Sequence, residues 1–130
     1  MKKVILIALL LTSVSTSALA EWTYTGGGGL NYDIYVDYGS IRKNGNKVKM
    51  WEMSNFKTLQ EAGGIKYLST VSQYEYDCQE ETMGQTAIIA YEGNMGVTPI
   101  SHDEFVRFKP APVPPNSIAT FMWKIACGRE

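Results

Sequence analysis

Residues 65–78, IKYLSTVSQYEYDC, alternate with a period of two over an unusual length, which is typical of a long β-strand. Because aromatic and hydroxyl side chains share one face, we interpret the surroundings of Tyr74 and Tyr76 as core packing beneath a helix rather than an exposed binding patch. One face would carry Leu68, Thr70, Ser72, Tyr74, Tyr76 and Cys78, and the other Ile65, Tyr67, Val71, Glu75 and Asp77.

The segments on either side predict further strands joined by turns. The pair Asn44-Gly45 favours a type I′ turn, so residues 40–43 and 46–56 are expected to form a hairpin. Residues 59–64 indicate a loop closed by Gly63-Gly64. We also expect strands over residues 21–25, 33–38 and 85–92, a glycine connector over 26–29, a turn over 93–96 and a less regular stretch over 97–108.

The last segment, residues 116–128, fits two structures. As a helix it would place Ile118, Phe121, Met122 and Ile125 on one stripe, with Asn116 or Ser117 at its start and Gly128 at its end. As a strand it would place Phe121, Trp123, Ile125 and Cys127 on one face. We favour the helix, because the prolines of residues 110–115 form an extended connector that is excluded from a sheet interior.

Two cysteines, Cys78 and Cys127, are present, and the N-terminus indicates that both lie in an oxidising compartment. Lys2 and Lys3, an apolar run over residues 4–11 and the small-residue site at residues 18–20 are typical of a cleaved Sec signal peptide. We therefore expect residues 1–20 to be removed, residues 21–130 to form a single domain, and the two cysteines to form a disulfide. The sequence predicts no transmembrane segment and no lipid anchor, and a periplasmic or secreted location.

The charge distribution excludes some partners and draws attention to one hairpin. Without residues 1–20 the chain has ten basic and 13 acidic residues, which disfavours nucleic acid and anionic membranes as partners. Four basic side chains nevertheless surround the Asn44-Gly45 turn. One hypothesis is a contact with an anionic partner; the other is a sheet edge kept soluble by lysines. The four residues are Arg42, Lys43, Lys47 and Lys49.

No combination of residues indicates an enzyme, a metal site or a cofactor. His102-Asp103-Glu104 is the one cluster of metal-ligand types, and a second histidine to complete a site is missing from the sequence. The acidic pairs Glu80-Glu81 and Glu75/Asp77 offer no sign that one carboxyl group of a pair is buried for acid–base catalysis. We therefore expect a protein that binds rather than catalyses.

Four stretches have an order and spacing that cover most of the expected mature chain. They are YVDYGSIRKNG at residues 35–45, KMWEM at 49–53, YEYDC at 74–78, and PPNS at 114–117 with Cys127 ten residues later. Together they resemble the surface-adhesin protein E family of exported Gram-negative proteins.

The resemblance implies an α+β fold: one antiparallel sheet of about six strands, with a C-terminal helix on its concave face, tethered by the Cys78–Cys127 disulfide. It also implies a non-enzymatic binding role toward host matrix or serum proteins such as vitronectin, laminin and plasminogen, or toward an envelope protein, and a possible homodimer. The alternative is a small periplasmic inhibitor of an enzyme such as lysozyme. Such an inhibitor would insert a loop into a catalytic cleft, and residues 26–29 or 93–96 are the candidates.

The first prediction concerns processing. Because the small-residue site ends at Ala20, mature protein isolated from a periplasmic or secreted fraction is expected to begin at Glu21. N-terminal sequencing or intact mass measurement tests this. Mature protein that retains Met1 would refute the signal peptide.

Overall fold

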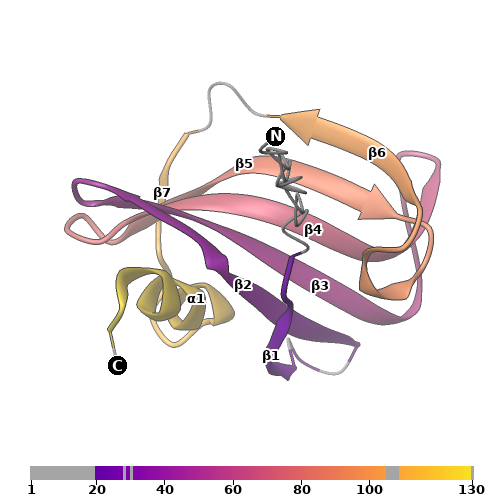
Figure 1. Cartoon of the computed structure of the whole chain (residues 1–130), viewed down its shortest axis with the longest axis horizontal. Helices are drawn as coiled ribbons and strands as arrows, with labels where there is room; N and C mark the ends of the chain where they lie inside the picture. Colours follow the sequence, from indigo (N-terminus) through magenta and orange to yellow (C-terminus); the bar gives the residue numbers. More distant parts are fainter. Residues whose placement is uncertain (1–19, 28, 30, 105–108, 130) are drawn as a thin grey trace, which may run out of the picture.

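Six strands pair in the order in which they follow one another along the chain, β1-β2-β3-β4-β5-β6, as an antiparallel meander (Figure 1). The computed structural model describes residues 20–27, 29, 31–104 and 109–129, so the predicted signal peptide, apart from Ala20, lies outside the described residues. The strands are β1 (Thr23–Gly27), β2 (Tyr32–Asn44), β3 (Lys47–Ala62), β4 (Ile65–Asp77), β5 (Thr82–Tyr91), β6 (Pro99–Glu104) and the short β7 (Ala111–Pro112). A single turn of 3-10 helix, η1 (Asn94–Gly96), and one α-helix, α1 (Ile118–Cys127), complete the fold.

The long alternating strand is confirmed as β4, and its tyrosine face is confirmed as core because Tyr76 is fully buried. The loop expected over residues 59–64 was wrong. Residues 60–62 pair with residues 65–67 of β4, and the two glycines of the turn adopt positive φ angles of 57° and 78°. Because the turn needs only two glycines, β3 continues to Ala62, through most of the segment that was expected to be a loop.

The β2–β3 hairpin is confirmed, but its tip is displaced by one residue from the prediction. Asn44 pairs with Lys47, so Gly45 and Asn46 form the turn. Of these two, Gly45 alone has a positive φ, 63°. A positive φ at the first central position is the pattern of a type II′ turn, whereas the expected type I′ needs it at both.

Two further segments are more regular than expected. Gly26 and Gly27 belong to β1, and residues 99–104 form β6 against β5. The proline-rich connector forms only the two-residue β7, which pairs with Thr82 and Met83 of β5 and stays at the edge, as proline requires.

The C-terminal helix is confirmed, but the face that it buries was predicted only in part, since Met122 and Ile125 of the expected stripe contact the core and the other two residues do not. Ser117 caps α1 by accepting a hydrogen bond from the Thr120 backbone N–H at 3.1 Å, and Gly128 ends the helix with a left-handed φ of 65°. The buried residues are Met122, Trp123 and Ala126, whereas Ile118 and Phe121 are 41% and 47% exposed. Among the described residues, no helix has the length and apolar character to cross a membrane.

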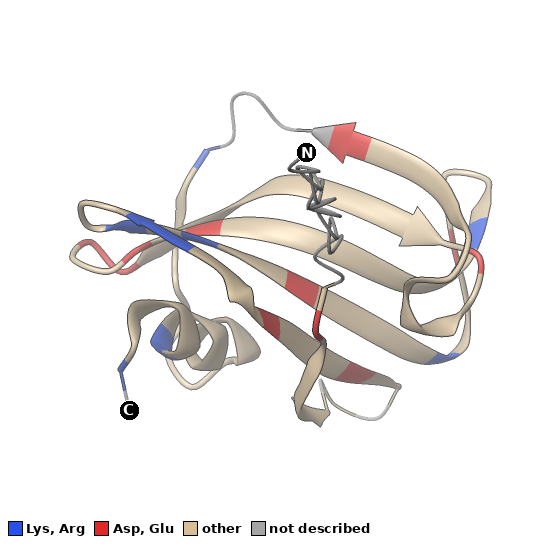
Figure 2. Cartoon of the chain, in the orientation of Figure 1, with Lys and Arg blue, Asp and Glu red and all other residues tan. Residues whose placement is uncertain are grey.

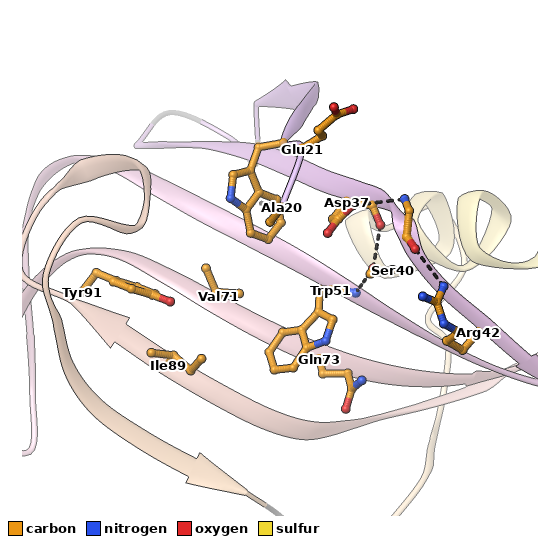
Figure 3. Close-up of a pocket in the computed structure, with 12 residues that line it drawn as sticks. Ala20, Glu21, Asp37, Ser40, Arg42, Trp51, Val71, Gln73, Ile89 and Tyr91 are labelled. Carbon is orange, nitrogen blue, oxygen red and sulfur yellow. Dashed lines mark hydrogen bonds between the residues drawn. The ribbon is translucent and has the colours of Figure 1, made fainter. Parts of the chain in front are cut away.

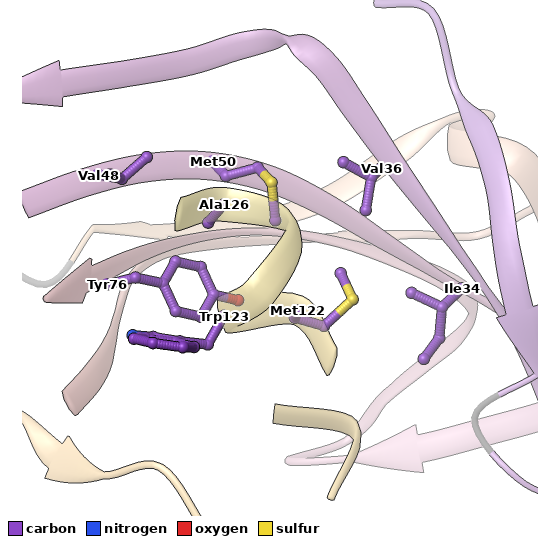
Figure 4. Packing of buried hydrophobic residues seen from close by; sticks show 8 residues of the cluster. All are labelled: Ile34, Val36, Val48, Met50, Tyr76, Met122, Trp123 and Ala126. Carbon is purple, nitrogen blue, oxygen red and sulfur yellow. The ribbon is translucent and has the colours of Figure 1, made fainter. Parts of the chain in front are cut away.

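The core lies between this helix and strands β2, β3 and β4 (Figure 4). Side chains at alternate positions of the strands point toward α1, and helix residues one turn apart pack against them. Its buried members are Ile34, Val36, Val48, Met50, Tyr76, Met122, Trp123 and Ala126.

Several contacts fix the C-terminal end of α1 to the end of β4. Cys78 and Cys127 form the expected disulfide, with Cα atoms 5.7 Å apart. The indole N–H of Trp123 donates a hydrogen bond to the Asp77 carbonyl at 2.9 Å, and the Arg129 guanidinium lies 5.3 Å from the Trp123 ring centroid. The confirmed fold is therefore one sheet with a disulfide-tethered helix on one of its faces.

The second prediction concerns this tether. The disulfide spans 49 residues, for which the chain-entropy model gives a stabilisation of about 4 kcal/mol. Cys127→Ser is expected to lower the free energy of unfolding by roughly 2–5 kcal/mol in denaturant titrations. Reduced wild-type protein is the control and should lose a similar amount. Two thiols that titrate in unreduced, folded wild-type protein would contradict the prediction.

Candidate functional site

Strand β2 carries a wide bulge just before the predicted basic hairpin. Four residues of β2, 38–41, face the single residue Met50 of β3, so the register shifts between Asp37 and Arg42. Bulges of this kind often re-aim side chains beside binding sites.

Local hydrogen bonds hold the bulge in shape. The Ser40 hydroxyl donates to the Asp37 carbonyl at 2.6 Å and accepts from the Trp51 backbone N–H at 2.9 Å, so it replaces a missing ladder bond. The Asp37 carboxylate accepts from the Gly39 N–H at 3.1 Å, and the Arg42 guanidinium donates to the Gly39 carbonyl at 2.8 Å. The bulge therefore fixes the guanidinium of Arg42 against its own backbone.

The four predicted basic residues lie together along the hairpin (Figure 2), but they do not share one environment. Arg42 stands directly opposite Lys49, which places two positive charges on the face away from α1, while Lys43 stands opposite the buried Val48. Lys47 forms an ion pair with Glu75 at 3.9 Å, the one ion pair found in the described part of the chain.

The outer edge of this half of β2 is open. Strand β1 pairs with residues 33–36 of β2, and within the described residues no strand pairs with the outer side of residues 37–44. An unpaired edge invites a further strand, and lysines are a common means of preventing that. The position of the basic hairpin at an unpaired sheet edge fits the hypothesis that its lysines keep the edge soluble. Its concentration of positive charge fits the hypothesis that it contacts an anionic partner.

A hollow of about 640 Å³ opens beside the bulge, on the sheet face that α1 leaves uncovered (Figure 3). Trp22, just before β1, and Trp51 of β3 supply two of its aromatic walls, and Tyr91 of β5 a third. Asp37 and Arg42 line it beside the bulge, so charged and aromatic groups meet in one recess.

Sequence reasoning missed this hollow and, apart from Arg42, the residues that line it. Trp51 lies inside a stretch that carried the family resemblance, but Trp22, just before β1, and Tyr91 of β5 are distant residues that only the folded sheet brings together. One local signal was available, because Asp37-Tyr38-Gly39-Ser40 places turn-forming residues in the middle of a strand.

The remaining candidates from the sequence lie elsewhere. His102 and Asp103 are exposed on β6, and Glu80 and Glu81 are exposed in the turn between β4 and β5. The Asp77 carboxylate accepts backbone N–H groups of that turn. None of these acidic residues lines the hollow.

A second recess, of about 270 Å³, lies on the opposite face between the sheet and the N-terminal end of α1. Glu52 of β3 lines it and accepts a hydrogen bond from the Tyr76 hydroxyl. Burial raises the pKa of Glu52 from 4.5 to about 8, and the hydrogen bond from Tyr76 offsets only part of that shift. Glu52 is therefore mostly protonated at neutral pH.

Comparison with known proteins places the chain in a family and identifies structures with the same fold. A family model described as surface-adhesin protein E matches residues 22–128. A structure of Haemophilus influenzae protein E aligns at 15% identity with a TM-score of 0.59, over 81% of this chain and 83% of that one. The crystal structure of protein E from non-typeable Haemophilus influenzae aligns at 14% identity with a TM-score of 0.59, over 87% and 79%. No curated protein matches the sequence. At these identities the likeness to the solved structures concerns the fold alone.

The third prediction follows from the pKa of Glu52. Because the folded state favours the protonated carboxyl group, its stabilising contribution is complete below about pH 4.5 and is lost as the pH rises through about 8. At about 1.4 kcal/mol per pKa unit, the wild-type protein loses several kcal/mol across this range. Glu52→Gln, which is uncharged throughout, is expected to lack that loss in denaturant titrations. Parallel pH profiles for the two proteins would contradict the prediction.

Proposed function

Because this chain belongs to the surface-adhesin protein E family, we propose that it is an exported, non-enzymatic binding protein whose partner is another protein. The partner would be a host matrix or serum protein, or a protein of the bacterial envelope. The observation that carries this proposal is the hollow beside the β2 bulge, on the sheet face without the helix.

The lining of the hollow suits a protein partner. Tryptophan, tyrosine and arginine are the residues that contribute most to binding energy in protein interfaces, and Trp22, Trp51, Tyr91 and Arg42 all line it. The two tryptophans and Tyr91 are only partly exposed, so each already lies against protein on one side. A rigid aromatic recess of this kind accepts an apolar side chain of a partner at little entropic cost.

The charges beside the hollow favour an acidic segment of that partner. Arg42 and Lys49 are like charges directly opposite each other, an arrangement that weakens strand pairing. Glu75 stands opposite Lys49 on the β4 side, so the uncompensated positive charge lies toward the open edge of β2. An acidic segment would therefore lie along β2 rather than β4.

The inhibitor alternative needs a loop that projects into a cleft. Residues 93–96 are instead fastened to the sheet, because the Asn94 side-chain amide donates to the Phe56 carbonyl at 2.8 Å and Gly96 donates to the Ser69 hydroxyl at 3.0 Å. These contacts favour a partner on the sheet face.

The fourth prediction tests the role of the lysines. A partner captured from envelope extract or host serum and identified by mass spectrometry is measured against wild-type protein at rising salt. The on-rate should fall steeply, because exposed charges are screened within about 10 Å at 0.1 M salt. Lys47→Gln with Lys49→Gln should slow association severalfold and leave the thermal midpoint nearly unchanged, since an exposed ion pair such as Lys47–Glu75 contributes about 1 kcal/mol at most.

The matched control carries the same change of charge at the other end of the sheet. Lys57, in the second half of β3, and Lys66, near the start of β4, are exposed there, so Lys57→Gln with Lys66→Gln should associate like wild-type protein. Two outcomes separate the hypotheses. A slower on-rate only in the hairpin variant supports binding. An unchanged on-rate combined with greater self-association assigns the hairpin lysines to protection of the β2 edge.

A further inference from the structure

The recess between the sheet and α1 has the features of a small built site. Its floor comes from β2, β3, β4 and β5, and the first turns of α1 close one side with the apolar residues Ile118, Ala119 and Met122. Its volume of about 270 Å³ lies just below the range of about 300–1,000 Å³ typical of ligand pockets, so any occupant is small. It lies on the face opposite the hollow described above and is independent of it.

Glu52 is the one carboxyl group among the residues that line this recess, and no lysine, arginine or histidine lines it. The side chain keeps some contact with solvent, so the carboxyl group is recessed but reachable. Within the described residues its one hydrogen bond comes from Tyr76. A carboxylate can accept about four, so Glu52 keeps acceptor capacity for a ligand.

Three tyrosines surround this carboxyl group. Tyr32, Tyr74 and Tyr76 all line the recess, and the rings of Tyr74 and Tyr76 are 6.1 Å apart between centroids. Burial raises the pKa of Tyr74 and of Tyr76, and the negative charge of an ionised Glu52 raises both further. The charge on Glu52 is therefore felt by both tyrosines. Tyr32 raises the pKa of Tyr74 as well.

We propose that this recess binds a small organic ammonium ion, with the Glu52 carboxylate, which accepts the Tyr76 hydroxyl, as its counter-ion and the half-buried tyrosines Tyr32 and Tyr74 around its cationic head. Aromatic rings attract cations through their negative faces, and a carboxylate beside them supplies the opposite charge. An anion would be repelled by the nearby charge of an ionised Glu52. A neutral polyol would need only the hydroxyl and amide groups of the recess, for which a carboxyl group is superfluous.

Binding of a cation would be coupled to release of a proton. Glu52 is mostly protonated at neutral pH, and an adjacent positive charge favours its ionised form. Below about pH 8 each ammonium ion bound is therefore expected to displace up to about one proton, and the apparent affinity should rise about tenfold per pH unit. The other titratable groups that face Glu52 are Tyr32, Tyr74 and Tyr76. Burial raises the pKa of Tyr74 and of Tyr76, so these two stay protonated over this range.

The test compares choline with 3,3-dimethylbutan-1-ol, its uncharged isostere, by calorimetry of wild-type protein in buffers with different heats of ionisation. Choline is expected to bind, with proton release near pH 6 and about fiftyfold higher affinity near pH 8, where about half of Glu52 is ionised in the free protein. The isostere should bind far more weakly. Glu52→Gln should lose choline binding, whereas Glu61→Gln, which removes an exposed carboxyl group from the same strand, should bind choline like wild-type protein.

Each outcome decides the proposal. Equal, pH-independent binding of both compounds would identify a neutral-ligand pocket and overturn it, and so would the absence of choline binding to wild-type protein at millimolar concentration above pH 8. The thermal midpoint of Glu52→Gln near pH 6 shows whether that variant is folded. If it is not, proton release on choline binding to wild-type protein still supports the proposal, and its absence overturns it.

Discussion

The attachment of α1 to the end of β4 determines which face of the sheet is covered by the helix and which is left uncovered. A single antiparallel sheet has two faces, and one helix can cover only one of them. The Cys78–Cys127 disulfide and the Trp123 indole bond to the Asp77 carbonyl hold the helix at the end where the β2–β3 and β4–β5 turns lie. The covered face becomes the core, and the other face carries the hollow.

The length of the helix explains why the covered face has a recess. Ten residues of α-helix extend about 15 Å, whereas the 13 residues of β4 extend about 43 Å. Because the C-terminal end of the helix is tethered, its N-terminal end stops partway along the strands. Glu52 lies at that point, beyond the packed layer of Met50 and Met122 but still on the same face. At this place Glu52 is neither closely packed nor fully hydrated. Because its charged form loses hydration there, its pKa rises.

Much of the fold was accessible from the sequence because it depends on local patterns. The alternation over residues 65–78, the Ser117 and Gly128 helix ends and the two cysteines each predicted what the structure shows. The helix face was not accessible in the same way. Two stripes with the same spacing compete, and the less apolar one is buried because Trp123 must reach the Asp77 carbonyl. Long-range geometry, rather than hydrophobicity, selects between them.

The sites were harder to predict because they depend on contacts between distant residues. The β2 bulge requires the Ser40 hydroxyl to replace a ladder bond to Trp51, 11 residues away, and the hollow combines aromatic residues from β3, from β5 and from the segment just before β1. Glu52 alternates in register with Val48 and Met50, so a period-two analysis of residues 48–52 alone places it on the core face. Burying a carboxyl group on a core face costs desolvation free energy, which its hydrogen bonds offset only in part. At 14–16% identity the fold persists while such details are free to change. The binding properties of this chain must therefore be sought in the bulge, the hollow and Glu52 rather than in the shape that it shares with its relatives.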